Sequence, residues 1–384
     1  MRLGLFVAHP DVLPAGHTSY QATLLQGLLR QARHQVVVFG SDHAEAPDVD
    51  APHELVRVAQ RRQPLIGAVN VDLYAEGAVR RAVERAKVDA LIVTAQFHAP
   101  RPRGVPRIAV LYEAAFLEKT PWGVYSAYSF RQALTVPQRN LDGAYAVVCL
   151  SEHGRARTER LFKVAPERLV LAPPSVLAFG AVASTSPLPG RPYVMQVGWF
   201  HPRKEVTLGL AAWRRAVESG LDVDLVLVGA EGPPDRNHGP LPRRVLDVVG
   251  HELFDRVHCP GSVPRRVLGS YYKHAQALLM TSLHEGFGLP AIEAASFGVP
   301  IVAVDRSSMP EVVGPIGTVV EPNPEAVSDA LVEVCSTAPD RDALRKYAAS
   351  FSVERQTAPF LDVADAIAAG ATSPAAFISP SEDV

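Results

Sequence analysis

The chain has 384 residues, more than one hydrophobic core usually organises, so two domains are expected. Its 47% hydrophobic and 20% charged residues are typical of a globular protein and exclude the disordered and fibrous classes. The formal charge of -2, from 38 basic and 40 acidic side chains, argues against a nucleic-acid-binding protein, because such domains are normally strongly basic.

The cysteine and hydropathy patterns bear on the compartment. The three cysteines are far apart and form no CxxC or Cys/His pairing, which favours a reducing cytoplasm. The first apolar run is interrupted at His9, too early for a signal peptide, and no run of about 18 apolar residues is present to span a membrane. We therefore expect a cytoplasmic protein that meets a membrane, if at all, from its inner face.

Short apolar runs alternate with longer stretches of helical periodicity, the pattern of parallel sheets covered by helices. The expected strands of the first half are residues 3–8, 36–39, 90–93, 107–112 and 146–150. Residues 18–33 place Tyr20, Leu24 and Leu28 on one helical face, so this segment should pack on the sheet.

A stretch rich in Pro, Ser, Ala and Gly divides the chain near residues 173–192. The alternation then restarts, with expected strands at 193–197, 224–229, 277–281, 301–304 and 318–320 and helices at 206–219, 242–253, 342–349 and from Pro290 onward. The sequence thus predicts an α/β protein with two Rossmann-like, doubly wound domains facing each other across a cleft. They are residues 1–175 and 192–350, joined by a linker at 176–191; a helix at about 353–369 should pack back on the first domain, ahead of a flexible tail at 371–384.

The segment SLHEGFGLPAIEAASFGVPIV, which begins at Ser282, has the layout of a loop, a helix and a strand. Gly286 and Gly288 lie in the loop, where missing side chains let backbone N–H groups approach a ligand. The helix that Pro290 can start adds partial positive charge at the same place. A phosphate or a polar sugar is the ligand that this arrangement favours.

Two carboxylates, Glu285 and Glu293, are separated by seven residues in this segment. A carboxylate accepts hydrogen bonds from vicinal hydroxyls, so one can hold a sugar and the other a ribose. The alternative is that Glu293 caps its helix and Glu285 is only solvated.

With EGFGLPAIEA, GVPIVA and PEVVG in the same order, the segment resembles the signature of the family 4 retaining glycosyltransferases of the GT-B fold. The resemblance implies an enzyme that moves a hexose from a nucleotide-diphosphate sugar to a polysaccharide, glycolipid or small glycoside. It implies that Glu285 meets hydroxyls of the donor sugar and Glu293 the ribose. It also implies that the amides of Phe287, Gly288 and Leu289 meet sugar and phosphate.

Two further blocks carry the resemblance. In QVGWFHPRKEVTLGL, Gly198 forms a turn after a strand, and Arg203 and Lys204 are implied to neutralise the donor diphosphate as it leaves, without a metal. The alternative is a basic pair at a helix start, which is unfavourable unless an anion offsets it. In the next block the resemblance implies that Gly229 lies beside the nucleotide and that Ser262 and Val263, after Gly261, line its base.

The first domain departs from the pattern. Gly16 remains as a phosphate neighbour where two glycines are common, and Tyr112 and Glu113 stand where many members have His-Asp. Glu113 can orient an acceptor hydroxyl or make a structural hydrogen bond, and both interpretations stay open. A catalytically silent partner that binds a nucleotide sugar is therefore the alternative function. The resemblance implies front-face substitution with retention, without a protein nucleophile.

We expect no metal and no cofactor besides the UDP- or GDP-linked donor. Asp48 with Asp50, and Asp222 with Asp224, mimic an Asp-x-Asp metal motif but lack its setting. A set of basic residues in the first domain has two interpretations: a solvated face, or docking on an anionic membrane near a lipid-linked acceptor. Its members are Arg57, Arg61, Arg62, Arg80, Arg81, Arg85 and Lys87. The sequence carries no information on the oligomeric state.

Overall fold

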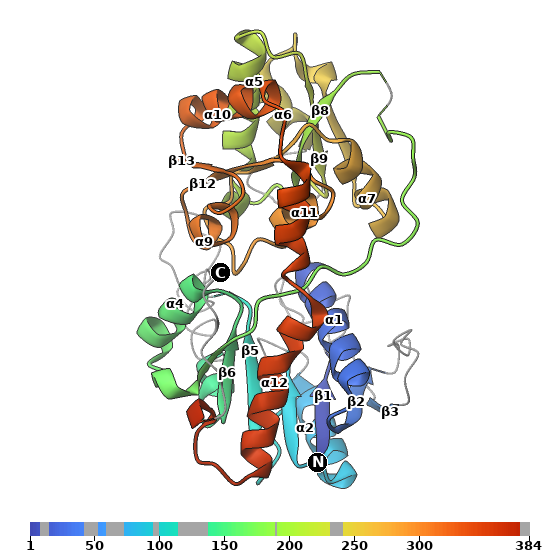
Figure 1. The fold of residues 1–384 in the computed structure, drawn as a ribbon, viewed down its shortest axis with the longest axis vertical. Helices are drawn as coiled ribbons and strands as arrows, with labels where there is room; N and C mark the ends of the chain where they lie inside the picture. The colour runs from blue at the N-terminus through green and yellow to red at the C-terminus, as the bar shows by residue number, and fades with distance from the viewer. Residues whose placement is uncertain are drawn as a thin grey trace. The chain divides into compact units, whose positions relative to one another are not determined.

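A computed structural model of the chain describes residues 1–7, 15–41, 53–58, 73–94, 100–113, 137–188, 190–230 and 241–376. It contains two compact units: unit 1 comprises Met1–Leu177 and Phe351–Val384, and unit 2 comprises Ala178–Ser350. Each unit is an α/β structure around one parallel sheet (Figure 1). The predicted α/β class with two Rossmann-like halves is confirmed.

Unit 1 is built on a seven-stranded sheet with the order β3-β2-β1-β4-β5-β6-β7. The strands are β1 (Arg2–Phe6), β2 (Gln35–Ser41), β3 (Glu54–Val58), β4 (Ala90–Val93), β5 (Arg107–Leu111), β6 (Ala146–Cys149) and β7 (Leu169–Leu171). The helices are α1 (Ala15–Gln31), α2 (Leu73–Ala86), α4 (Glu152–Phe162) and α12 (Val353–Ala368), with short 3-10 turns at Pro166–Arg168 and Pro374–Ala376.

Apart from Arg107 at the start of β5, the central strands β4, β5 and β6 of unit 1 are apolar because both faces of the sheet are covered. Every residue of β4, β5 and β6 is buried. Strand β3 is an edge strand with polar, partly exposed residues, whereas β7, at the other edge, is a short apolar strand with the sequence LVL. The sequence pattern predicted the other five strands and missed these two; the exposed edge position explains this for β3, and β7 was missed although it is apolar.

Helix α12 comes from the far end of the chain and packs against α1 within unit 1 (Figure 1). Gly27 makes the close approach feasible: a Cβ on it would lie 1.9 Å from the Thr357 Oγ1 atom. Gln356, which is fully buried, accepts hydrogen bonds from the Ser175 backbone N–H (3.0 Å) and the Thr23 hydroxyl (2.7 Å) and donates to the Tyr20 carbonyl (3.0 Å). The contact is thus both close-packed and hydrogen-bonded.

Unit 2 has a six-stranded parallel sheet with the order β10-β9-β8-β11-β12-β13. The strands are β8 (Tyr193–Val197), β9 (Asp224–Val228), β10 (Val257–Gly261), β11 (Ala277–Met280), β12 (Ile301–Val304) and β13 (Thr318–Val320). The helices are α5 (Val206–Glu218), α6 (Leu241–Val249), α7 (Arg265–His274), α8 (Leu289–Ser296), α9 (Met309–Val313), α10 (Pro324–Ser336) and α11 (Arg341–Ala349), with 3-10 turns at Pro202–Lys204 (η4) and Phe254–Arg256.

One face of the unit 2 sheet is covered by α5 and α10, which lie side by side (Figure 1). Trp213 of α5 and Leu331 of α10 are fully buried in this core with strand residues such as Leu225 and Leu279. Among the described residues no helix is long and apolar enough to cross a membrane. The last eight residues of the predicted tail, 377–384, lie outside the described part of the chain.

Candidate active site

Three glycines mark the carboxyl edge of the unit 2 sheet. Gly198 follows β8, Gly229 follows β9 and Gly261 ends β10. The Gly198 N–H donates to the Val228 carbonyl (2.9 Å) and the Gly229 N–H to the Gly261 carbonyl (2.8 Å), so the three turns adjoin. Strands β8 and β11 are neighbours in the middle of the sheet, where the chain order reverses. Ligands of open parallel sheets bind at such a point, beyond the carboxyl ends of the strands.

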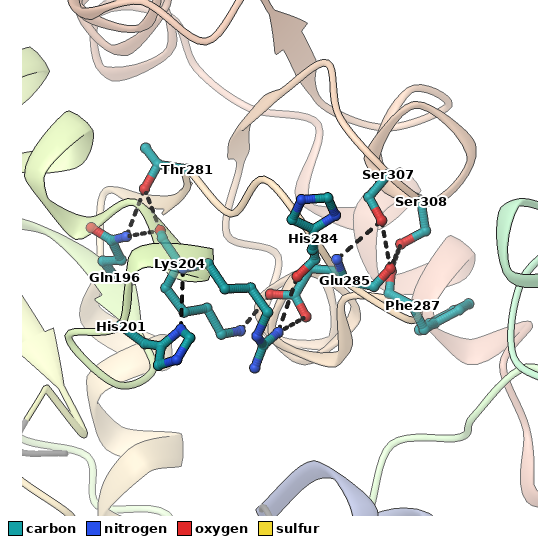
Figure 2. Close-up of polar contacts among 10 residues, drawn as sticks. Gln196, His201, Lys204, Thr281, His284, Glu285, Phe287, Ser307 and Ser308 are labelled. Carbon is teal, nitrogen blue, oxygen red and sulfur yellow. Dashed lines mark hydrogen bonds and ion pairs between the residues drawn. The ribbon is translucent and has the colours of Figure 1, made fainter. Parts of the chain in front are cut away.

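Two loops meet at this switch point and bring three predicted residues together. Lys204 and Arg203 belong to η4, between β8 and α5, and Glu285 belongs to the loop between β11 and α8. Lys204 Nζ donates to Glu285 Oε1 (Figure 2). Arg203 Nη1 lies 3.5 Å from Glu285 Oε2. Residues 81 positions apart in the chain thus form one charged cluster, here called the Glu285 cluster.

The Glu285 carboxylate is charged although it is nearly buried. Its side chain is 9% exposed, and those of Lys204 and Arg203 are 13% and 25% exposed. Burial by itself raises the pKa of Glu285, but the charges of Lys204 and Arg203 and hydrogen bonds from Lys204 and Ser282 outweigh burial and lower this pKa below its usual value. The site therefore holds two cations around one ionised carboxylate.

The backbone of Glu285 is held by two serines at the start of α9 (Figure 2). Its N–H donates to Ser307 Oγ (3.0 Å), while the hydroxyls of Ser307 (2.6 Å) and Ser308 (3.3 Å) donate to its carbonyl. Ser308 Oγ also donates to the Phe287 carbonyl at 2.9 Å. The loop is therefore anchored on both sides of Gly286, which leaves little freedom for the carboxylate.

The η4 turn is fixed in a similar way. Thr281 Oγ1 donates to the carbonyls of Lys204 (3.0 Å) and Glu205 (2.9 Å), and Gln196 Nε2 donates to Thr281 Oγ1 at 2.8 Å. His201 Nδ1 accepts a bond from the Arg203 N–H at 3.1 Å, as Figure 2 shows for the labelled His201 side chain. The two loops thus form a rigid frame for the Glu285 cluster.

Two glycines are required by geometry here. Gly288 has φ 104°, and a Cβ on it would lie 2.4 Å from Met309 Cε. Gly198 has φ 136°, and a Cβ on it would lie 3.2 Å from Lys204 Cε. A side chain at either position would strain the backbone and displace a neighbour. Phe287 is only 4% exposed, so this residue can offer a ligand its backbone but little of its ring.

Glu293 is the fifth residue of α8 and is buried. Its hydrogen-bond partners are not members of the Glu285 cluster. Its Oε1 accepts a hydrogen bond from Arg265 Nη1 (2.8 Å) and its Oε2 from the Tyr272 hydroxyl (2.9 Å). It does not cap the helix, because the N-cap residue of α8 is Gly288. Its contact with a ribose stays a prediction.

The other predicted residues are placed as follows. Ser262 is exposed and Val263 partly exposed, directly after β10, and Leu289 is the first residue of α8. In unit 1, Gly16 is exposed in the first turn of α1 and Glu113 is partly exposed just after β5. The roles assigned to all five stay predictions.

Tyr112, beside Glu113, is 3% exposed, and its ring stacks on His17 with a centroid distance of 3.8 Å. Burial raises the pKa of this phenol, and the neighbouring side chains of Gln21 and Thr94 offset a part of this rise. Tyr112 is therefore a neutral, buried group and cannot serve as an exposed acid or base.

Sequence reasoning missed the residues that hold the site. Ser307 and Ser308 support Glu285, Thr281 supports Lys204, and Arg265 and Tyr272 bind Glu293. The only available signal was adjacency: Ser307 and Ser308 precede the matched PEVVG block, and Thr281 precedes the motif.

No three His, Cys, Asp or Glu side chains gather into a metal-binding group within the described ranges. Asp222 and Asp224 instead accept bonds from Arg256, at 2.9 and 3.1 Å. Asp48 and Asp50 lie outside the described residues, as do Arg61 and Arg62. Arg57, Arg81, Arg85 and Lys87 are exposed and Arg80 is partly exposed, so both interpretations of the basic set stay open.

Comparison with known proteins identifies the class. Residues 183–351 match the family described as "Glycosyl transferases group 1". The matched residues make up nearly all of unit 2, so the resemblance to the glycosyltransferases inferred from the sequence is confirmed there. The HepE protein of Anabaena, solved in complex with UDP and glucose, has a TM-score of 0.68 at 14% identity, with 95% of this chain and 100% of that chain covered. At this identity the likeness shows the fold, which is GT-B.

Two curated relatives are similar over part of the chain. The O-antigen chain mannosyltransferase B of Escherichia coli is 30% identical over 200 residues, which cover 48% of this chain and 49% of the relative. The MMP alpha-(1->4)-mannosyltransferase of Mycolicibacterium hassiacum is 36% identical over 96 residues, covering 25% of this chain and 22% of the relative. The matches thus span at most about half of each relative's length.

Proposed function

We propose that this protein is a metal-independent, retaining glycosyltransferase that moves a hexose, specifically mannose, from a nucleotide-diphosphate sugar to a carbohydrate or lipid-linked acceptor. The observation that carries the proposal is the Glu285 cluster: two cations and a buried carboxylate beside the amino terminus of α8. The choice of mannose rests on the names of the two curated relatives.

In the proposed reaction Glu285 binds hydroxyls of the donor hexose, and Arg203 and Lys204 stabilise the diphosphate. The bond between the anomeric carbon and the diphosphate oxygen breaks as the acceptor oxygen bonds to the same face of that carbon. The acceptor proton passes to the departing phosphate oxygen, so the protein needs no nucleophile. Developing negative charge on the diphosphate is stabilised by the cations, which lowers the barrier.

The test is a donor screen with GDP-mannose, UDP-glucose and dTDP-glucose, following slow donor hydrolysis and transfer to simple mannosides. NMR of the product reports the anomeric configuration, and a parallel assay with EDTA tests metal dependence. Glu285→Gln should reduce turnover at least about a hundredfold. Glu325→Gln is the matched control, because Glu325 pairs with Arg215 on the surface, where both side chains are at least half exposed. Equal turnover of Glu285→Gln and wild type contradicts the proposal, as does an inverted product.

The second candidate is a nucleotide-sugar-binding partner without turnover. The burial of Tyr112 favours it, because the phenol that stands at this position after β5 is not exposed. Donor binding by calorimetry without hydrolysis or transfer would support this candidate and reject the enzyme.

A further inference from the structure

Glu293 is held by a cluster of side chains that the proposed reaction does not use. Arg265 Nη1 and the Tyr272 hydroxyl each donate to a different oxygen of its carboxylate, at 2.8 and 2.9 Å. Tyr272 is fully buried; burial, and secondly the charge of Glu293, raise the pKa of its phenol well above the ordinary value. The phenol therefore remains a hydrogen-bond donor at every working pH.

Arg265 is itself fixed by the first residues of unit 2. Its guanidinium carbon lies 4.0 Å from the centre of the Phe179 ring, and its Nε donates to the Ala178 carbonyl at 3.1 Å. The Phe179 ring meets those of Tyr272 and Phe297 edge-on, with centroid distances of 5.8 and 5.0 Å. Arg265 thus has one orientation, set by a cation-π contact on one side and the carboxylate on the other.

A carboxylate offers about four lone-pair sites, and two of those on Glu293 are occupied. The remaining lone-pair sites can accept hydrogen bonds from a ligand's N–H or O–H groups. Arg265 and Tyr272 fix the directions in which these sites point. The side chain retains 8% exposure, so a ligand can reach its edge and cannot surround it. A pair of vicinal hydroxyls fits this requirement, because it supplies two donors at a fixed spacing.

We propose that Arg265 and Tyr272 are positioning residues that orient the Glu293 carboxylate toward the ribose hydroxyls of the donor nucleotide, and that Phe179 holds Arg265 in place. This inference rests on the proposed function, which supplies the nucleotide. It assigns the segment that opens unit 2 a part in nucleotide affinity, although Phe179 itself does not touch the ligand.

Calorimetry with four probes tests this: UDP, GDP and their 2′,3′-dideoxy counterparts. Because Tyr272→Phe removes only the hydroxyl, it should weaken the preferred ribonucleotide about tenfold and change the dideoxynucleotide less than twofold. Phe179→Leu keeps both hydrogen bonds to Glu293 but removes the ring under Arg265, so a ribonucleotide-specific loss of about threefold is expected. Tyr271→Phe is the control, since Tyr271 lies on the same helix and is only partly buried.

An equal loss for the ribo- and dideoxynucleotides in Tyr272→Phe means a structural role only and overturns the inference, as does no loss. If circular dichroism shows that Tyr272→Phe does not fold, Phe179→Leu serves as the test: an equal loss for the ribo- and dideoxynucleotides, or no loss, overturns the inference. Wild-type protein that binds both kinds of nucleotide equally overturns the inference and leaves the proposed function standing. If neither UDP nor GDP binds the wild type, both are overturned.

Discussion

Replacing Lys204 by Met tests whether the Glu285 cluster is held together by charge. The substitution keeps the apolar stem of the side chain and removes the ammonium that bonds to Glu285. Glu285, 9% exposed, would then keep Arg203 at 3.5 Å and the hydrogen bond from Ser282. Removal of one partner from a buried pair costs about 3 to 5 kcal/mol, and since Arg203 remains we expect about 2 to 4 kcal/mol in the unfolding free energy of unit 2.

The loss should depend on pH in a defined direction. In the wild type the pKa of Glu285 is lowered, so its contribution is complete above the ordinary carboxyl pKa and lost as the pH falls through the folded-state value. In Lys204→Met one of the two cations that lower the pKa of Glu285 is missing, so burial raises this pKa relative to the wild type. On acidification Glu285 of the variant becomes protonated, which removes the cost of its buried, incompletely paired charge. The stability difference should therefore shrink between pH 7 and about pH 4.

Urea unfolding followed by tryptophan fluorescence measures this difference, because Trp213 is fully buried in unit 2 and bonds to the Val223 carbonyl. Arg215→Met is the control: its partner Glu325 is exposed, so the change should stay within about 1 kcal/mol at both pH values. A loss for Lys204→Met as small as the control's, or one that is the same at pH 7 and pH 4, refutes the reasoning.

Two further predictions concern backbone positions. Glu205 has φ 43°, and burial raises the pKa of its carboxyl, so Glu205→Gly should stabilise unit 2 by about 1 kcal/mol in thermal melts; a lower melting temperature contradicts this. Gly27→Ala should destabilise unit 1 by about 1 to 3 kcal/mol because its Cβ would meet Thr357, whereas Gly77→Ala in α2, whose Cβ would lie 3.7 Å from its nearest neighbour, should stabilise by about 0.5 to 1 kcal/mol. Equal shifts in these two glycine variants would reject the packing argument.

How much of the fold was predictable depended on burial. Strands such as β4 and β12 are buried along their length and appear in the sequence as apolar runs. Strand β10 reads VHCPG, with a proline, mostly partly exposed residues and an irregular register against β9. An edge strand of this kind has no apolar run and no alternation, so its sequence does not predict it.

The site divides in the same way between local and tertiary information. The glycines, the proline and Glu285 lie within six residues of one another, so a loop before a helix could be predicted from spacing alone. That Lys204 bonds to Glu285 depends on the adjacency of β8 and β11, which the chain order does not state. The partners of Glu293 lie on α7, and the sequence does not predict them because it does not state which helices pack together.

The charges of the Glu285 cluster suggest why its residues occur together. Arg203 and Lys204 carry two positive charges and Glu285 one negative charge, which leaves an excess of one positive charge at the carboxyl edge of the sheet. Without Glu285 the two cations would repel each other beside the start of α5, where the helix dipole also disfavours them. With Glu285 they are kept in place before any ligand arrives, and the remaining positive charge still attracts a diphosphate. A carboxylate assigned to sugar binding thus also preorganises the cations assigned to the leaving group, so that Glu285→Gln should weaken nucleoside diphosphate binding as well as turnover.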